Sequence, residues 1–185
     1  MMTSNIKQRT ITLLAVTTLT TSALGGIAIN HESASAATAS TKQIKIDENT
    51  AVKKFKQKFK DSKVNEIQLE SNRGQYQYEV SGFDGNKEYT ADVNAKTGKV
   101  TKTETERLDQ DEQKSNDLDL SQLISRKQAT KIAEKQVKGS HAKEWVLENE
   151  DGTPTWKVTV HKDGQSTDVK INAQNKQVLQ AEKDS

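Results

Sequence analysis

Few side chains in this 185-residue sequence could carry chemistry, because it contains no cysteine and only three histidines. The absence of cysteine excludes disulfides, thiolate metal sites and a cysteine nucleophile. His141 and His161 have a spacing that fits no zinc motif, and no Gly-x-Ser-x-Gly element accompanies the serines. We therefore expect exposed histidines, no metal or other cofactor, and no catalytic residues, so that the protein is not an enzyme.

Two sets of acidic residues match known sites only in part. Asp109 and Asp111 begin like a calcium-binding loop, but Lys114 stands where such a loop needs glycine. Glu148 and Glu150 share one face of a predicted strand, as the carboxylates of a glycosidase can, yet a unit of about 60 residues rarely encloses a cleft. We expect solvated side chains in both places.

Lysines and aromatic residues are the remaining candidates for binding. One run of lysines could contact anionic envelope polymers or an acidic partner, although the solvent-exposed face of an amphipathic helix has the same composition. The run comprises Lys53, Lys54, Lys56, Lys58, Lys60 and Lys63. Four aromatic residues could stack on sugars or bases, but core-facing strand positions explain them better. These are Tyr76, Tyr78, Trp145 and Trp156. The formal net charge of +2 is too small for a nucleic-acid-binding protein, so no nucleic-acid partner is expected.

Residues 1–36 have the composition of a secretory signal peptide. A short basic start precedes an uncharged stretch over residues 11–29, and the small side chains of Ala34 and Ala36 suit a signal peptidase. We expect cleavage before Ala37 and no stable membrane insertion afterwards; an uncleaved anchor helix is the alternative. An exported chain without cysteine favours a Gram-positive type of extracellular space.

The remaining chain repeats itself at a constant offset of 78 residues. Ala51 then aligns with Ala129 and Val80 with Val158, and 14 of the 59 positions from 46 to 104 are identical. The identities fall on apolar, glycine and turn positions. The predicted organisation is a disordered lead-in (37–42), a first repeat (43–104), an acidic flexible linker (105–120), a second repeat (121–182) and a tail (183–185).

The residue pattern of each repeat predicts one amphipathic helix followed by strands. Apolar residues recur at spacings of three and four after Asp47 and Ser125, the predicted N-caps, and Gly139 is expected to end the second helix. Alternating apolar and polar residues then predict half-buried strands separated by turns. The predicted fold class is α+β, with two tandem units that each pack an N-terminal helix on a three- to four-stranded antiparallel sheet.

Two strand motifs resemble the PepSY domain family. The first is an aromatic residue two positions before valine, at Tyr78 and Val80 and again at Trp156 and Val158. The second closes each repeat; its residues are Asn94, Ala95, Gly98 and Val100 in the first copy and Asn172, Ala173 and Val178 in the second. The second copy lacks the glycine, and Asn175 is expected to serve the same turn because asparagine tolerates a left-handed backbone.

The resemblance implies a small, exported or membrane-proximal, non-catalytic domain of the kind found in pro-regions of thermolysin-like metallopeptidases. It implies inhibition or regulation of an extracellular peptidase, acting in trans because no peptidase domain is attached. An exposed strand edge or loop would then pair with the enzyme's cleft. The alternative is a module that binds the cell envelope or a surface protein through the lysine-rich first helix. The oligomeric state is not indicated.

Overall fold

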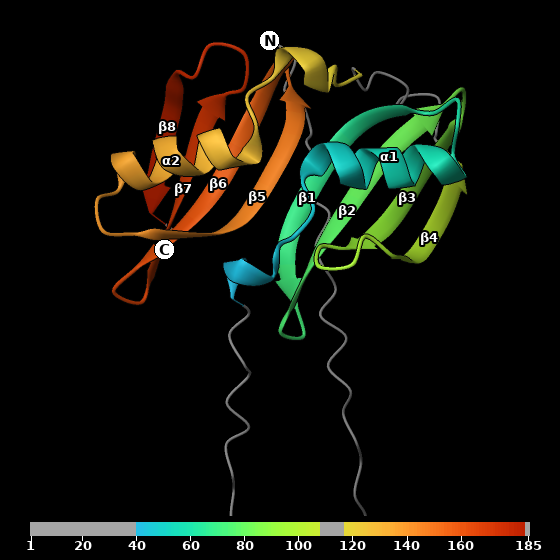
Figure 1. The fold of residues 1–185 in the computed structure, drawn as a ribbon. Coiled ribbons are helices and arrows are strands. Elements are labelled where there is room, and N and C mark those ends of the chain that lie inside the picture. Colours follow the sequence, from blue (N-terminus) through green and yellow to red (C-terminus); the bar gives the residue numbers. More distant parts are fainter. Residues whose placement is uncertain (1–39, 108–116, 184–185) are drawn as a thin grey trace, which may run out of the picture. The chain divides into compact units, whose positions relative to one another are not determined.

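The computed structural model describes residues 40–107 and 117–183, and the same order of elements occurs twice (Figure 1). The first half contains η1 (Thr41–Gln43), α1 (Glu48–Lys58), β1 (Lys63–Asn72), β2 (Gln75–Asp84), β3 (Lys87–Asn94) and β4 (Val100–Arg107). The second half contains η2 (Leu120–Gln122), α2 (Arg126–Gln136), β5 (His141–Glu150), β6 (Thr153–Lys162), β7 (Gln165–Asn172) and β8 (Val178–Lys183). The α+β class with antiparallel strands is confirmed.

Both helices begin at the predicted caps. The Asp47 carboxylate accepts a hydrogen bond from the Thr50 N–H (2.8 Å). Hydrogen bonding by the Thr50 side chain, together with this N–H, lowers the pKa of Asp47. Ser125 and Gln128 form a reciprocal capping box. The second helix ends at Gln136, before the glycine that was expected to end it.

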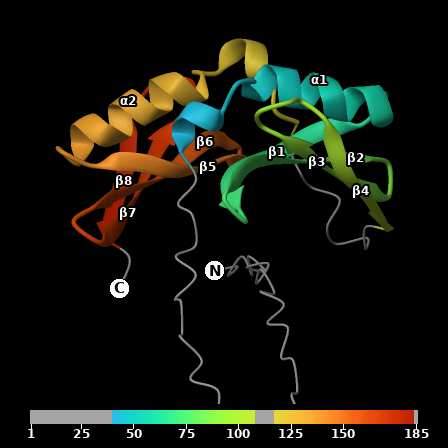
Figure 2. The same ribbon diagram turned by 60° about the horizontal axis from the view of Figure 1, so that its bottom comes forward.

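The eight strands form one antiparallel sheet in the order β4-β3-β2-β1-β5-β6-β7-β8. This differs from the expected separate sheet in each repeat, because β1 pairs directly with β5. Both helices lie on the same face of the sheet, α1 over β2 and β3 and α2 over β5, β6 and β7 (Figures 1 and 2). No described element covers the opposite face, which we call the open face.

Some ordered elements cross the boundaries drawn from the sequence. The strand β4 extends to Arg107, inside the expected linker, and Leu118 is buried and donates its N–H to the Val64 carbonyl (2.7 Å). The helix η1 occupies part of the expected lead-in, and β8 reaches Lys183 in the expected tail. Residues 1–39, with the expected cleavage site at Ala34, Ala36 and Ala37, and residues 108–116 lie outside the described part of the chain.

The core lies between the helices and the sheet. Equivalent aromatic residues tie the segment before each helix to the sheet: the Tyr78 hydroxyl donates to the Ile46 carbonyl (3.1 Å), and Trp156 Nε1 donates to the Ile124 carbonyl (2.9 Å). Burial raises the pKa of Tyr78 to about 12, partly offset by the nearby Arg126 charge. Tyr76, Tyr78, Trp145 and Trp156 are all at most 2% exposed, so their prediction as core residues is confirmed and stacking on a ligand is wrong.

Candidate functional site

The junction of the two repeats is symmetric. Gln68 of β1 lies opposite Val146 of β5, and these residues are equivalents at the repeat offset. On either side, Ile67 pairs with Leu147 and Leu69 pairs with Trp145. Because Ile67 is equivalent to Trp145 and Leu69 to Leu147, exchanging the two repeats converts one pair into the other. The register therefore places a local pseudo-two-fold axis at Gln68 and Val146, and each repeat supplies the same strand to the interface.

A buried polar contact joins the two helix N-termini on the same axis. The Glu48 carboxylate accepts a hydrogen bond from the Arg126 backbone N–H (3.0 Å), and these residues are 78 positions apart. Glu48 is 5% exposed and Arg126 8% exposed. The Glu48 carboxylate thus satisfies one of the free N–H groups at the start of α2, where the helix dipole favours a negative charge.

The Arg126 side chain completes this junction. Its guanidinium lies 4.9 Å from the centroid of the Trp145 ring, which makes a cation–π contact, and the Tyr76 ring lies 6.0 Å from the Trp145 ring. The start of α1 in the first repeat therefore meets α2 and β5 of the second repeat in one cluster. This cluster was not predicted from the sequence, in which its one sign is that the repeat offset aligns Glu48 with Arg126.

The family-motif residues lie in the core and in turns. Val80, Ala95, Val158 and Ala173 are fully buried, and Val100 and Val178 are half-buried. The Asn94 carboxamide oxygen accepts hydrogen bonds from the Lys96 and Thr97 N–H groups. The Asn172 oxygen does the same for Gln174 and Asn175. These side chains form part of the core and of the turns that close each repeat.

The second turn differs from the sequence-based expectation. Gly98 has φ 70° in the first repeat, and its equivalent Lys176 has φ 69°. The expectation that Asn175 takes the left-handed conformation is therefore wrong. Asn175 instead accepts a hydrogen bond from the Gln177 N–H (2.9 Å) within the turn.

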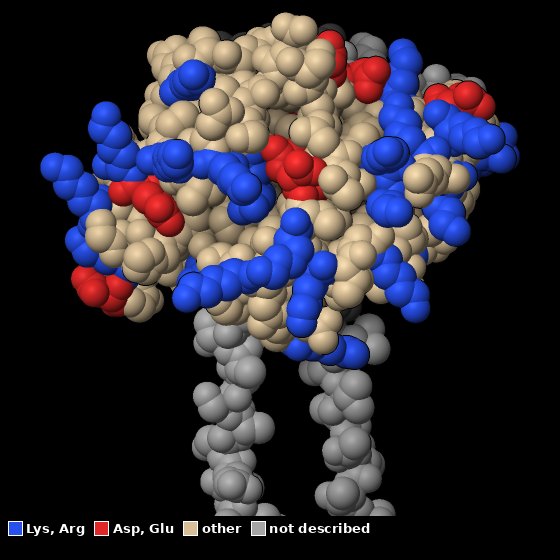
Figure 3. All heavy atoms as spheres, viewed as in Figure 1, with Lys and Arg blue, Asp and Glu red and all other residues tan. Residues whose placement is uncertain are grey.

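The open face carries clustered carboxylates. Glu79 of β2 lies directly opposite Asp92 of β3, and their neighbours include Glu70, Glu104 and Lys102. Partial desolvation and mutual repulsion raise the pKa of Glu70, Glu79 and Asp92. The helix-bearing face is instead rich in lysine (Figure 3). The lysines of the two helices are Lys53, Lys54, Lys56, Lys58, Lys127, Lys131 and Lys135.

The two histidines lie directly opposite each other on β5 and β6. Both are exposed as predicted, and the Ser166 hydroxyl lies 3.3 Å from His161 Nε2, a contact that local sequence did not indicate. The described ranges hold no group of three or more residues able to bind a metal. Glu150 forms an ion pair with Lys170 (2.6 Å). Asp109 and Asp111 lie outside the described residues.

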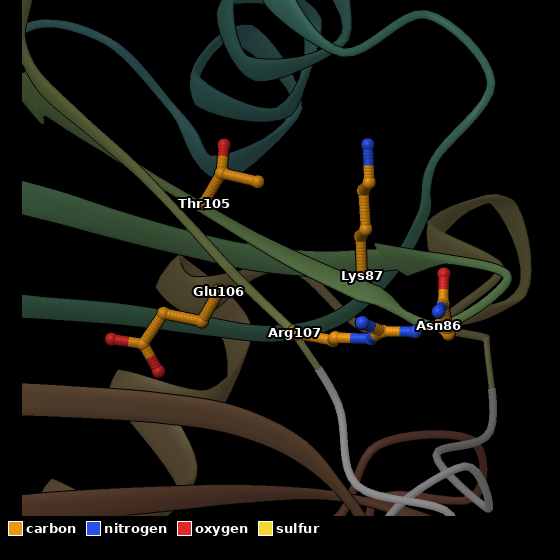
Figure 4. Close-up of a pocket in the computed structure, with 5 residues that line it drawn as sticks. All are labelled: Asn86, Lys87, Thr105, Glu106 and Arg107. Carbon is orange, nitrogen blue, oxygen red and sulfur yellow. The ribbon is translucent and has the colours of Figure 1, made fainter.

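The surface of the described residues includes two shallow hollows with charged lining residues. One, of about 390 Å³, lies at the end of the β3–β4 pair and is lined by Asn86, Lys87, Thr105, Glu106 and Arg107. Figure 4 shows its Lys87 amine and Glu106 carboxylate pointing in different directions. The second hollow, of about 470 Å³, lies between α2 and the start of β8. Among the described residues, no hydrogen bond links the Thr105 hydroxyl of the first hollow to Lys87 or Glu106.

The strands β4 and β8 form the two edges of the sheet. Half of the β4 residues are charged, whereas β8 carries only Glu182 and Lys183. Leu179 of β8 is 47% exposed, the one large apolar side chain so exposed within the described residues. Charges on an edge strand discourage pairing with another chain, so β8 is the less protected edge.

The described residues thus define an α+β protein built from two copies of one helix followed by four antiparallel strands. The model of the PepSY family, "Peptidase propeptide and YPEB domain", matches residues 45–104 and 123–182, and the chain belongs to this family as a tandem repeat. No curated protein matches the sequence. Among the described residues, no helix has the length and apolar character needed to cross a membrane.

Two solved structures are similar to the chain. The first is a "putative lipoprotein" from Clostridium difficile 630, which is 31% identical, with a TM-score of 0.69 over 76% of this chain and 95% of that chain. The second is the YpmB protein from Bacillus subtilis, which is 19% identical, with a TM-score of 0.35 over 74% of this chain and 97% of that chain. The first match shows that nearly the whole length of another protein shares this arrangement.

Proposed function

We propose that this protein is exported and binds an extracellular peptidase, which it restrains without being an enzyme itself. The observation that carries the proposal is the free edge of β8 in a protein whose family takes its name from peptidase propeptides. A peptidase cleft binds its substrates as extended strands, and an exposed sheet edge offers the same main-chain hydrogen bonds. The signal peptide predicted for residues 1–36 supports the extracellular location.

The hydrogen-bonding pattern identifies which atoms of β8 would contact the enzyme. The Asn172 N–H donates to the Gln177 carbonyl, so alternate residues of β7 face β8. Lys170 and Asp168 are among these residues, and they pair with Gln180 and Glu182 of β8. The backbone N–H and C=O groups of Gln180 and Glu182 therefore point toward β7, and those of Ala181, between them, point away from it. The N–H of Ala181 consequently points outward, beside the exposed Leu179. An enzyme-bound strand would pair there, and Leu179 would provide the apolar contact.

Matched proline variants test the edge. Ala181→Pro removes an outward N–H from β8 without breaking the ladder to β7, and Thr103→Pro makes the equivalent change on β4. The assay measures hydrolysis of fluorogenic casein by culture supernatant of the producing organism, with residues 37–185 added at micromolar concentration. Thermal unfolding of each variant checks that both still fold.

We expect the wild type and Thr103→Pro to slow hydrolysis and Ala181→Pro to lose most of this effect. A folded Ala181→Pro protein that inhibits as well as the wild type would refute the assignment to β8. If the wild-type protein neither binds nor slows any secreted peptidase of its host, the proposed function is wrong.

A second candidate function is binding to anionic polymers of the cell envelope. It is favoured by the lysines on the helix-bearing face, which extend beyond α1 to α2 (Figure 3). Binding of this kind is electrostatic and weakens as salt screens the charges. Co-sedimentation with isolated cell walls at low salt, lost at high salt, is the expected result. No sedimentation at low salt would remove this candidate.

A further inference from the structure

The hollow between α2 and β8 is lined by three lysines and an apolar wall. The lysines come from two elements, Lys131 and Lys135 from the helix and Lys176 from the β7–β8 turn. Half-buried Ile132 and Val178 form the apolar part of the lining. None of the three amines makes an ion pair or hydrogen bond with another described residue. Three lysines therefore line one hollow, and their amines have no ion-pair partner among the described residues.

Lys176 occupies this position at an energetic cost. Its φ of 69° lies in the left-handed region, which a lysine side chain disfavours and which glycine adopts freely. The other non-glycine residues with positive φ, which are Arg73, Asp151 and Asp163, each precede a glycine within a tight hairpin turn. Lys176 has no such glycine after it, so turn geometry does not explain the choice of lysine.

The first repeat shows that the turn does not need a lysine. At the positions equivalent to Lys131, Lys135 and Lys176 it has Lys53, Gln57 and Gly98. The helix dipole favours a cation at Lys135, in the last turn of α2, but it does not reach a residue of the β7–β8 turn. The three-lysine cluster is thus specific to the second repeat.

We propose that this hollow, lined by Lys131, Lys135 and Lys176, is a binding site for a phosphate group, and that Ile132 and Val178 contact the aliphatic part of a phosphate ester. Lysine ammonium groups bind phosphate as compact point charges, and three of them match a group that carries up to two negative charges. This site adjoins the start of β8, because Val178 belongs to that strand, but the proposal does not depend on the proposed function.

The test is an NMR titration of ¹⁵N-labelled residues 37–185 with inorganic phosphate and with glycerol 3-phosphate. Sodium acetate at the same ionic strength is the control ligand, because it supplies an anion without phosphate. We expect saturable shifts of the Lys176, Ile132 and Val178 amides with both phosphate probes and not with acetate. Tighter binding of glycerol 3-phosphate would identify an ester as the ligand, and equal binding would identify the phosphate group alone.

Lys176→Gly separates binding from folding. It installs the residue of the first repeat, so we expect a higher unfolding temperature together with phosphate binding weakened up to about fivefold, as for loss of one exposed charge contact. Lys131→Gln should weaken binding similarly, and Lys53→Gln, the equivalent change in the first repeat, should not. Equal shifts with acetate, or undiminished binding by both Lys176→Gly and Lys131→Gln, would overturn the proposal.

Discussion

The buried contact between Glu48 and Arg126 predicts that the two repeats unfold together. Replacing Glu48 by alanine removes the carboxylate that accepts the Arg126 N–H at 3.0 Å and leaves that N–H buried at the start of α2. The change is made in the first repeat, but the unsatisfied group lies in the second. Its effect on the second repeat therefore measures the coupling across the junction.

The magnitude follows from the burial of the contact. An unsatisfied buried donor costs about 1–3 kcal/mol, and the lost interaction of a carboxylate with the helix dipole accounts for part of the same sum. We expect Glu48→Ala to lower the free energy of unfolding by about 2 kcal/mol, which for a domain of this size lowers the unfolding temperature by about 4–8 °C. Glu48→Gln keeps an acceptor oxygen and should cost about 1 kcal/mol or less.

Urea unfolding followed by tryptophan fluorescence is the measurement, because both tryptophans of the protein, Trp145 and Trp156, lie in the second repeat. Asp61→Ala, which removes an exposed carboxylate from the first repeat, is the matched control and should stay within about 0.5 kcal/mol of the wild type. A fluorescence transition unchanged by Glu48→Ala would refute the coupling. A loss with Glu48→Gln as large as with Glu48→Ala would refute the role given to the hydrogen bond.

Three further predictions concern the sheet and its turns. Residues 37–107 and 117–185 made as separate chains should each show weak protection from hydrogen exchange, and mixing them should restore it, because each alone exposes its junction strand. Glu79→Gln should stabilise the protein by about 0.2–1 kcal/mol at pH 7, since Glu79 faces Asp92. The pKa of both Glu79 and Asp92 is raised on folding, so the folded state binds protons more readily than the unfolded state. The free energy of unfolding of the wild type, measured in urea, should therefore rise from pH 7 to pH 5. Glu79→Gln should reduce this rise. Lys176→Gly should raise the free energy of unfolding by about 0.5–1 kcal/mol in thermal or urea unfolding, through relief of the left-handed backbone.

Sequence patterns predicted the elements well because each depends on nearby residues. Asp47 and Ser125 cap the helices because their side-chain oxygens reach N–H groups three residues away. Alternation in segments such as Tyr76 to Val80 reports which side of a strand is buried, and burial bears this out. The turn at Lys176 was mispredicted because intrinsic preference favoured asparagine, whereas the register of the turn places the next residue in the left-handed region.

The candidate sites depended on contacts that no local pattern contains. The pairing of His141 with His161, the lysine-lined hollow and the cluster around Arg126 each join residues from different elements. Sequence separation says nothing about such neighbours until the register of the strands is known. The charge on the two helices could be predicted, but the presence of three lysines around one hollow could not.

The sequence by itself determined a tandem α+β protein of the PepSY family, because the repeat offset, the helix caps and the strand alternation are local or periodic features. Only the tertiary structure decided that the two repeats share one sheet. The physical reason is that strand pairing is made by backbone groups that every residue carries, so an exposed edge can be satisfied by any partner of suitable register. At Gln68 and Val146 that partner is the other copy of the same strand. On the same axis, the buried Glu48 carboxylate accepts a hydrogen bond from the backbone N–H of Arg126, the residue at the equivalent position of the second repeat.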